Sequence, residues 1–150
     1  VDVVAGALAE LGTEHAFVVH GAGKLDEISL AGPTIMTEVR AGSVRKFEVT
    51  PEDFGKKPAP LEMIQGGNLA ENAALIRDLL DGVVKTEGDR ARCDIVVMNG
   101  SAALVAAGVA GNFREGAELA EKALREGSAA RKLEALRQYG DEKGVSPGRV

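Results

Sequence analysis

Residues 1–21 read VDVVAGALAELGTEHAFVVHG, in which a helical pattern leads into a short apolar run. Over residues 1–11, apolar side chains recur at the spacing of one helical face, and Gly12 follows as a stop signal. Residues 16–19 are all apolar, which is typical of a strand buried on both faces. A helix that leads into such a strand predicts an α/β fold with a partial, mostly parallel sheet covered by helices.

A β-hairpin is predicted next along the chain. Polar and apolar residues alternate over residues 34–40 and 44–49, and residues 41–43 between them suit a turn. Residues 50–53 combine an N-cap, a proline and two acids, which predicts a helix of a single turn. The hairpin is therefore an insertion before the helical part of the chain.

The remainder of the chain is predicted to be helical. Helices are expected over residues 69–80, 90–110, 113–125 and 128–139. The second of these segments also contains a run that suits a buried strand, but its length favours a helix. Gly140 is expected to end the last helix, which leaves residues 141–150 as a disordered tail.

The composition is that of an ordinary globular domain. The chain has 150 residues, of which 45% are hydrophobic and 27% are charged, and this excludes a disordered polypeptide. A net charge of -5 with only 3% aromatic residues argues against binding to nucleic acid or to an anionic membrane. The longest apolar run, residues 102–107, is far shorter than the roughly 20 residues that cross a bilayer. Cys93 is the only cysteine, so a reducing, cytoplasmic setting is expected.

The loop at residues 21–33 is the first place where chemistry is expected. It is rich in glycine, it follows the predicted strand, and it carries the adjacent acids Asp26 and Glu27. Ligands of open α/β sheets bind beyond the carboxyl ends of the strands. Two adjacent carboxylates can hold a hard cation such as Mg²⁺, whose remaining waters a phosphate can replace. The alternative is a pair of solvated acids on a surface loop.

Two further polar segments each allow two interpretations. The backbone N–H groups of residues 66–68 could bind a phosphate at a helix start, or these residues could form a turn and an N-cap. His20, at the end of the predicted strand, is either an acid–base group or a hydrogen-bonded loop residue.

Three further positions are expected to have structural roles. Asn99, inside an apolar segment, is interpreted as a buried amide that caps a neighbouring backbone group, with Gly100 permitting close packing. Lys56 and Lys57 are expected to form a solvated surface pair. Cys93 is interpreted as a small buried hydrophobic residue.

Several segments together carry a resemblance to a known family. In chain order they are VVHG at 18–21, LDEISL at 25–30, GPT at 32–34, TPEDFG at 50–55, GGN at 66–68, ENA at 71–73, and Asn99. In their order and spacing, from Val1 to about Tyr139, the chain resembles the C-terminal half of the anthranilate phosphoribosyltransferase family. The resemblance implies that residues 1–140 form the C-terminal part of an α/β domain of the nucleoside phosphorylase and phosphoribosyltransferase type, and that the family's N-terminal helical domain is absent.

The resemblance also implies a function. The family transfers a 5-phosphoribosyl group from phosphoribosyl pyrophosphate to anthranilate and releases pyrophosphate, the second step of tryptophan biosynthesis. It requires Mg²⁺, and its metal-binding Asp-Glu pair falls on Asp26 and Glu27, whereas no catalytic residue is identified in this chain. A cytoplasmic full-length homodimer is implied, together with a fragment that is inactive alone because the substrate loops lie upstream. The alternative is a relative of the same fold without this activity, such as a nucleoside phosphorylase-like or noncatalytic binding module.

Two positions depart from the family pattern. Lys24 stands where the family often has glycine, and Gly100 stands where the family commonly has alanine. Lys24 is expected either to alter the backbone of the acidic loop or to add a cation near the phosphates.

Overall fold

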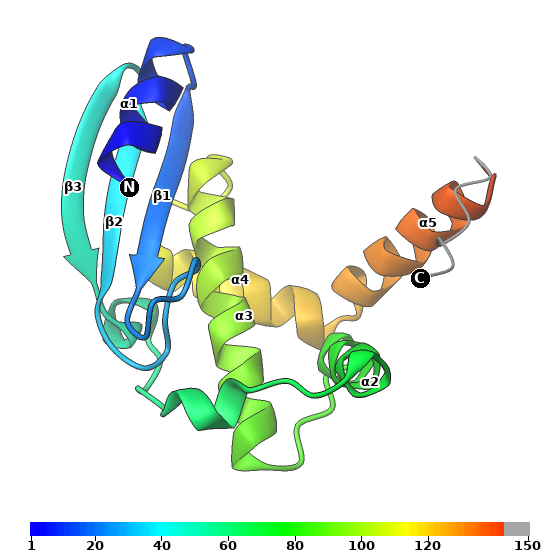
Figure 1. Ribbon diagram of the computed structural model, residues 1–150. Helices are drawn as coiled ribbons and strands as arrows, with labels where there is room; N and C mark the ends of the chain where they lie inside the picture. The colour runs from blue at the N-terminus through cyan, green and yellow to red at the C-terminus, as the bar shows by residue number, and fades with distance from the viewer. Residues whose placement is uncertain (143–150) are drawn as a thin grey trace.

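A three-stranded sheet and a long helix beside it organise the structure, a computed structural model that describes residues 1–142 (Figure 1). The strands are β1 (His15–Gly21), β2 (Thr34–Arg40) and β3 (Ser43–Val49). The α-helices are α1 (Asp2–Glu10), α2 (Leu69–Leu80), α3 (Glu87–Ala106), α4 (Phe113–Arg125) and α5 (Ser128–Glu142). Single turns of 3₁₀-helix form at Pro51–Phe54 and Leu61–Ile64. None of these helices is both long and apolar enough to span a bilayer.

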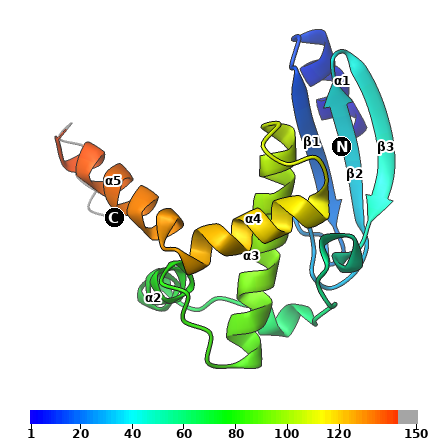
Figure 2. The same cartoon turned by 180° about the vertical axis from the view of Figure 1, so that it is seen from behind.

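The α/β class is confirmed, but the parallel pairing predicted for the sheet is wrong for the strands described. The order is β1-β2-β3, and both neighbouring pairs are antiparallel. A parallel pair needs a second strand after a crossover helix, whereas β1 is followed by a loop and a hairpin and then only by helices. The residues predicted to be buried on both faces of β1 are only half-buried, as are all residues from His15 to Val19. In Figures 1 and 2, α1 lies against one face of the sheet.

The predicted hairpin is confirmed, with a shorter turn than expected. Ser43 pairs with Arg40, so it belongs to β3, and only Ala41 and Gly42 make the turn. Both have positive φ angles, 48° and 81°, which is the backbone of a two-residue turn whose twist matches that of the strands.

The four longer helices are confirmed. Residues 90–110 are helical over most of their length as part of α3, as the length of the segment favoured. At the start of α2, Asn68 and Glu71 form a reciprocal capping box, and Gly82 beyond its end has a φ of 71°. The end predicted at Gly140 is wrong, because this glycine keeps a helical backbone and α5 continues to Glu142. The rest of the predicted tail, residues 143–150, lies outside the described residues.

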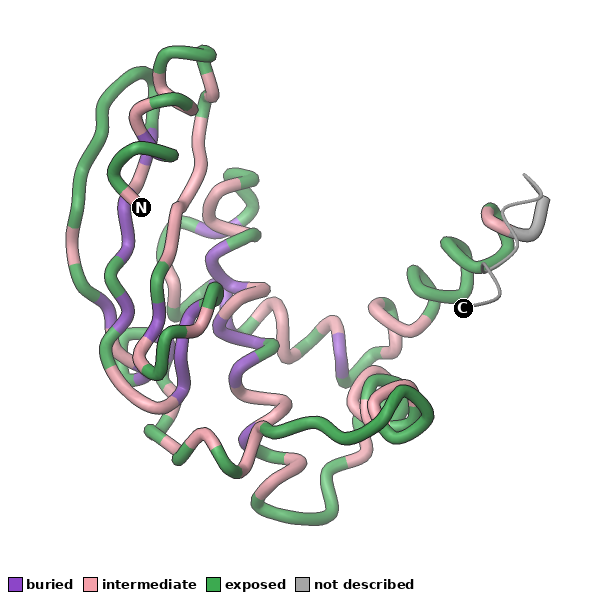
Figure 3. The backbone as a smooth tube through the Cα atoms, viewed as in Figure 1, coloured by how far each residue is buried: buried purple, intermediate pink, exposed green. Residues whose placement is uncertain are grey.

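The core lies where α3 meets the loop after β1, the sheet and the turn at Pro51–Phe54. Its members are apolar side chains from elements far apart in the chain, among them Ile28, Leu30, Met36, Phe54, Ile95, Val97 and Met98. Burial is concentrated in α3 and the inner side of the sheet, whereas α2 and α5 are largely exposed (Figure 3). The acidic loop is therefore built directly onto the core.

Candidate metal-binding loop

Asp26 and Glu27, the acid pair, lie exposed on the loop between β1 and β2. The three residues that follow them are almost completely buried: Ile28, Ser29 and Leu30 have exposed fractions of 1%, 0% and 1%. The sequence places two charged residues immediately before an apolar anchor, and the chain folds with the anchor in the core. The two carboxylates consequently reach solvent from a firmly held backbone.

The start of the loop doubles back on itself just past β1. The Gly21 N–H donates a hydrogen bond to the Leu25 carbonyl at 2.9 Å, and the Ala22 N–H donates to the Pro33 carbonyl at 3.0 Å. A side chain at Gly21 would meet the Glu27 carbonyl, and its Cβ would lie 2.9 Å from Ser29 Cβ. Glycine is therefore required at this position for the loop to bring the acid pair back beside the strand end.

The far side of the loop is held by buried hydroxyl groups. The Ser29 N–H donates to Thr34 Oγ1 at 2.9 Å, and the Ala31 N–H donates to Ser29 Oγ at 3.1 Å. Ser29 and Thr34 are both fully buried. Each hydroxyl thus satisfies a backbone donor that burial would otherwise leave unpaired.

The amide of Asn99 on α3 holds the residue that follows the acid pair. The Ile28 N–H donates to Asn99 Oδ1 at 2.9 Å, and Asn99 Nδ2 donates to the Ile28 carbonyl at 3.1 Å. The same Nδ2 donates to the Ile95 carbonyl at 2.9 Å, one helical turn earlier. The prediction that Asn99 caps a backbone group is confirmed, although the residue is partly rather than fully buried. An asparagine inside an apolar helix was the signal for this contact, but its partner could not be found from the sequence.

Lys24 keeps the loop conformation that a glycine would adopt. Its φ is 63°, in the left-handed region, and the preceding Gly23 has a φ of 81°. A lysine in this region carries a steric cost that glycine avoids. Lys24 thus leaves the backbone of the loop unchanged but adds a conformational cost.

The electrostatics of the acid pair suit a cation. Burial, and then the neighbouring charge of Asp26, raise the pKa of Glu27 above its ordinary value. A cation bound between the two carboxylates would relieve that repulsion. Across residues 1–142, no group of three or more metal-ligating side chains gathers. Mg²⁺ is commonly held by one or two carboxylates together with waters and substrate phosphates, so a two-carboxylate donor set fits it.

The other candidate residues lie outside this loop. At residues 66–68, the N–H groups of Gly67 and Asn68 already donate to Asn72 Oδ1 and Glu71 Oε2, so the turn and N-cap interpretation is confirmed. His20 is exposed at the end of β1. The structure does not bring these segments into contact with the acid pair through any hydrogen bond among the described residues.

The prediction that Lys56 and Lys57 are both solvated on the surface is wrong for Lys56. Lys57 is exposed, but the Lys56 side chain is only 9% exposed and forms ion pairs with Asp94 of α3 and Glu121 of α4. Cys93, next to Asp94, packs half-buried against the core, and burial is the main cause that raises the pKa of its thiol. Its packing fits the interpretation as a small hydrophobic residue, although it is half-buried rather than buried.

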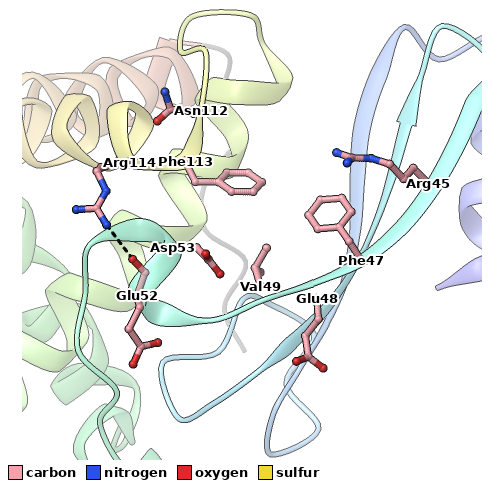
Figure 4. A pocket seen from close by; sticks show the side chains of 9 residues that line it. All are labelled: Arg45, Phe47, Glu48, Val49, Glu52, Asp53, Asn112, Phe113 and Arg114. Carbon is pink, nitrogen blue, oxygen red and sulfur yellow. Dashed lines mark hydrogen bonds between the residues drawn. The ribbon is translucent and has the colours of Figure 1, made fainter.

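A cavity of about 580 Å³ lies between the end of β3 and the start of α4 (Figure 4). The rings of Phe47 and Phe113 point toward one another across it, and the Arg114 guanidinium donates to the Glu52 carbonyl at 3.2 Å. The acid pair does not line this cavity. This hollow is therefore distinct from the candidate metal-binding loop.

Comparison with known proteins identifies the family and the fold. Residues 1–130 match the glycosyl transferase family, a/b domain, and the chain belongs to this family. Its relatives are anthranilate phosphoribosyltransferases. The chain is 48% identical to the one from Pelotomaculum thermopropionicum over 139 residues, which make up 92% of this chain and 39% of that protein.

Solved structures of such enzymes have the same fold. The crystal structure of the anthranilate phosphoribosyltransferase from Thermus thermophilus matches with a TM-score of 0.76 and 40% identity, covering 87% of this chain and 37% of that one. The Saccharomyces cerevisiae enzyme in complex with PRPP and Mg matches with a TM-score of 0.70 and 27% identity, covering 79% and 33%. The chain spans 39%, about two fifths, of the length of the relative from Pelotomaculum thermopropionicum.

Proposed function

We propose that this chain forms the metal-binding part of an anthranilate phosphoribosyltransferase. The observation that carries the proposal is the acid pair, exposed on a loop whose next three residues are buried in the core. Membership of the glycosyl transferase family and the similarity to a yeast relative in complex with PRPP and Mg support it. The reaction proposed for the full-length protein is transfer of the 5-phosphoribosyl group from phosphoribosyl pyrophosphate to anthranilate, with release of pyrophosphate.

In this mechanism Asp26 and Glu27 would hold Mg²⁺ through their carboxylate oxygens. Held there, Mg²⁺ would supply charge neutralisation for the departing pyrophosphate. Asn99, Ser29 and Thr34 fix the backbone that carries the two carboxylates. The contribution of this chain is then orientation and electrostatics rather than proton transfer.

We also propose where the substrates bind, how the full-length protein assembles and where it is located. The residues that contact anthranilate and the phosphoribosyl group are proposed to lie in the part of the relatives that this chain does not span. A homodimer of the full-length protein and a cytoplasmic location are also proposed, the latter supported by a single cysteine, which permits no intrachain disulfide.

The test is complementation of activity. The loss of anthranilate fluorescence is followed with phosphoribosyl pyrophosphate and Mg²⁺, using the chain alone and the chain mixed with the upstream part of the Pelotomaculum relative. Activity is expected only in the mixture. The double variant Asp26→Asn, Glu27→Gln should then lower the rate by about 10²-fold or more, as loss of a transition-state electrostatic contact does.

A matched control separates the site from overall charge. The double variant Glu118→Gln, Glu126→Gln removes two negative charges from exposed positions on and just after α4, and it should retain the wild-type rate. Equal rates for both double variants would reject the metal site. If light scattering shows that the two parts associate but the wild-type mixture has no activity, the result would favour a relative of the same fold without this activity.

A further inference from the structure

We propose that Asn99 is a positioning residue that sets the acid pair for cation binding through the backbone of Ile28. The proposal rests on the proposed function, because it assumes that Asp26 and Glu27 bind the metal. It concerns a side chain on α3 that lies 71 residues from its partner in sequence and hydrogen-bonds to the backbone of Ile28.

The amide can occupy this place in only one orientation. Oδ1 accepts from the Ile28 N–H, while Nδ2 donates to the carbonyls of Ile28 and Ile95. Rotating the amide by 180° would set an NH₂ group against an N–H donor and an oxygen against two carbonyls. The bond to Ile95, within the same helix, thus locks the side chain before it meets the loop.

The peptide unit that Asn99 holds also belongs to the acid pair. The Ile28 N–H and the Glu27 carbonyl share one planar peptide group, so fixing the N–H also fixes the position of the Glu27 Cα, which lies in the same plane. On the other side, Gly21 lies against the Glu27 carbonyl so closely that no side chain fits there. Asn99 and Gly21 therefore hold this peptide group between them.

The carboxylates themselves have no comparable support. Among the described residues, no side chain or backbone group hydrogen-bonds to the carboxylate of Asp26 or Glu27, and both residues are exposed. The backbone is consequently the only part of the acid pair that these contacts hold in place, and it sets the positions from which both carboxylates extend. Residues that orient metal ligands from behind typically change metal affinity by 10- to 100-fold when they are replaced.

The test measures binding of Mn²⁺ alone, by electron paramagnetic resonance, beside thermal stability. Asn99→Ala removes both contacts to Ile28. Ser101→Ala is the matched control, because Ser101 also lies on α3 and donates a single side-chain hydrogen bond, to the Phe113 carbonyl at 2.6 Å, away from the loop. If Asn99→Ala proves too unstable, Asn99→Ser supplies a smaller change at the same position.

Asn99→Ala is expected to weaken Mn²⁺ binding about tenfold or more, toward the level of the variant Asp26→Asn, Glu27→Gln. Ser101→Ala should stay within about twofold of wild type at a similar loss of thermal stability. Wild-type Mn²⁺ affinity in the Asn99 variants, with affinity lost in the acid-pair variant, would overturn the positioning role alone. Unchanged affinity in the acid-pair variant would overturn the proposed metal site and the positioning role with it.

Discussion

Gly116 of α4 lies directly against Ser101 of α3, and this contact sets how closely the two helices pack. A Cβ added at Gly116 would fall 2.6 Å from Ser101 Oγ, 2.8 Å from its carbonyl oxygen and 3.1 Å from its Cα. The Ser101 hydroxyl in turn donates to the Phe113 carbonyl at the start of α4. The close approach that the sequence suggested for Gly100 is therefore found at Gly116.

Gly116→Ala is expected to destabilise the protein by about 2 kcal/mol, because the new methyl group meets backbone atoms that cannot turn away. Gly100→Ala is the matched control. A Cβ there would lie 3.5 Å from Ala120 Cβ, an ordinary contact, and alanine favours the helix by up to about 1 kcal/mol. Urea unfolding measures both variants. Equal stability of the two would contradict the close packing at Gly116.

Lys56 links α3 and α4 through ion pairs with Asp94 and Glu121, and replacing it should lower the stability of the fold. Lys56→Met leaves the partly exposed carboxylates of Asp94 and Glu121 without their shared cation, which is expected to lower the free energy of unfolding by about 2 kcal/mol, between the values typical of exposed and buried pairs. Lys57→Met, at the exposed neighbour, should change it by no more than about 0.5 kcal/mol. Similar losses in both variants would indicate a general effect of charge rather than loss of the Lys56 ion pairs.

Lys24 provides a test of strain in the acidic loop. Lys24→Gly is expected to raise the free energy of unfolding by about 1 kcal/mol, because glycine adopts the observed φ of 63° without a steric cost. Lys24→Ala removes the same charge but keeps the side chain that the left-handed region disfavours, so it should give no such gain. Thermal unfolding of the two variants separates strain from charge, and a gain in both would point to charge.

Local signals were sufficient to predict most elements of this fold. Glycines after α1 and α2 mark the helix ends, and the Asn68–Glu71 capping box begins α2 through contacts only three residues apart. The hairpin was likewise visible because its alternation and its turn are contiguous in the chain. Such features depend on near neighbours, which a single sequence displays.

Partners that are distant in sequence could not be predicted. Nothing in the sequence near Lys56 indicates Asp94 and Glu121, which are brought to it by the packing of α3 and α4. The direction of strand pairing failed for a related reason, since an apolar run identifies a strand but not its neighbour. For the acid pair, the sequence displayed the two carboxylates, whereas the contact of Asn99 with Ile28 emerged only from the packing of α3.

Glu38 on β2 makes stability dependent on pH in the acidic range. Burial alone would raise the pKa of its carboxyl group, but hydrogen bonds from Arg45 and His15 outweigh burial and hold the pKa below its ordinary value. The charged carboxylate therefore stabilises the fold at pH values above the pKa in the unfolded chain. This contribution is lost as the pH falls through the lowered pKa of the folded state.

Glu38→Gln should thus be less stable than wild type at neutral pH, and the difference should shrink as the pH falls toward 3, below the ordinary carboxyl range. Urea unfolding at several pH values between 3 and 7 measures this difference. Glu48→Gln, at an exposed position on β3, is the matched control and should track wild type throughout. A difference between Glu38→Gln and wild type that stays constant with pH would mean that the neutral side chain, not the loss of its charge, accounts for the change. The hydrogen bonds to Arg45 and His15 would then stabilise the sheet independently of ionisation.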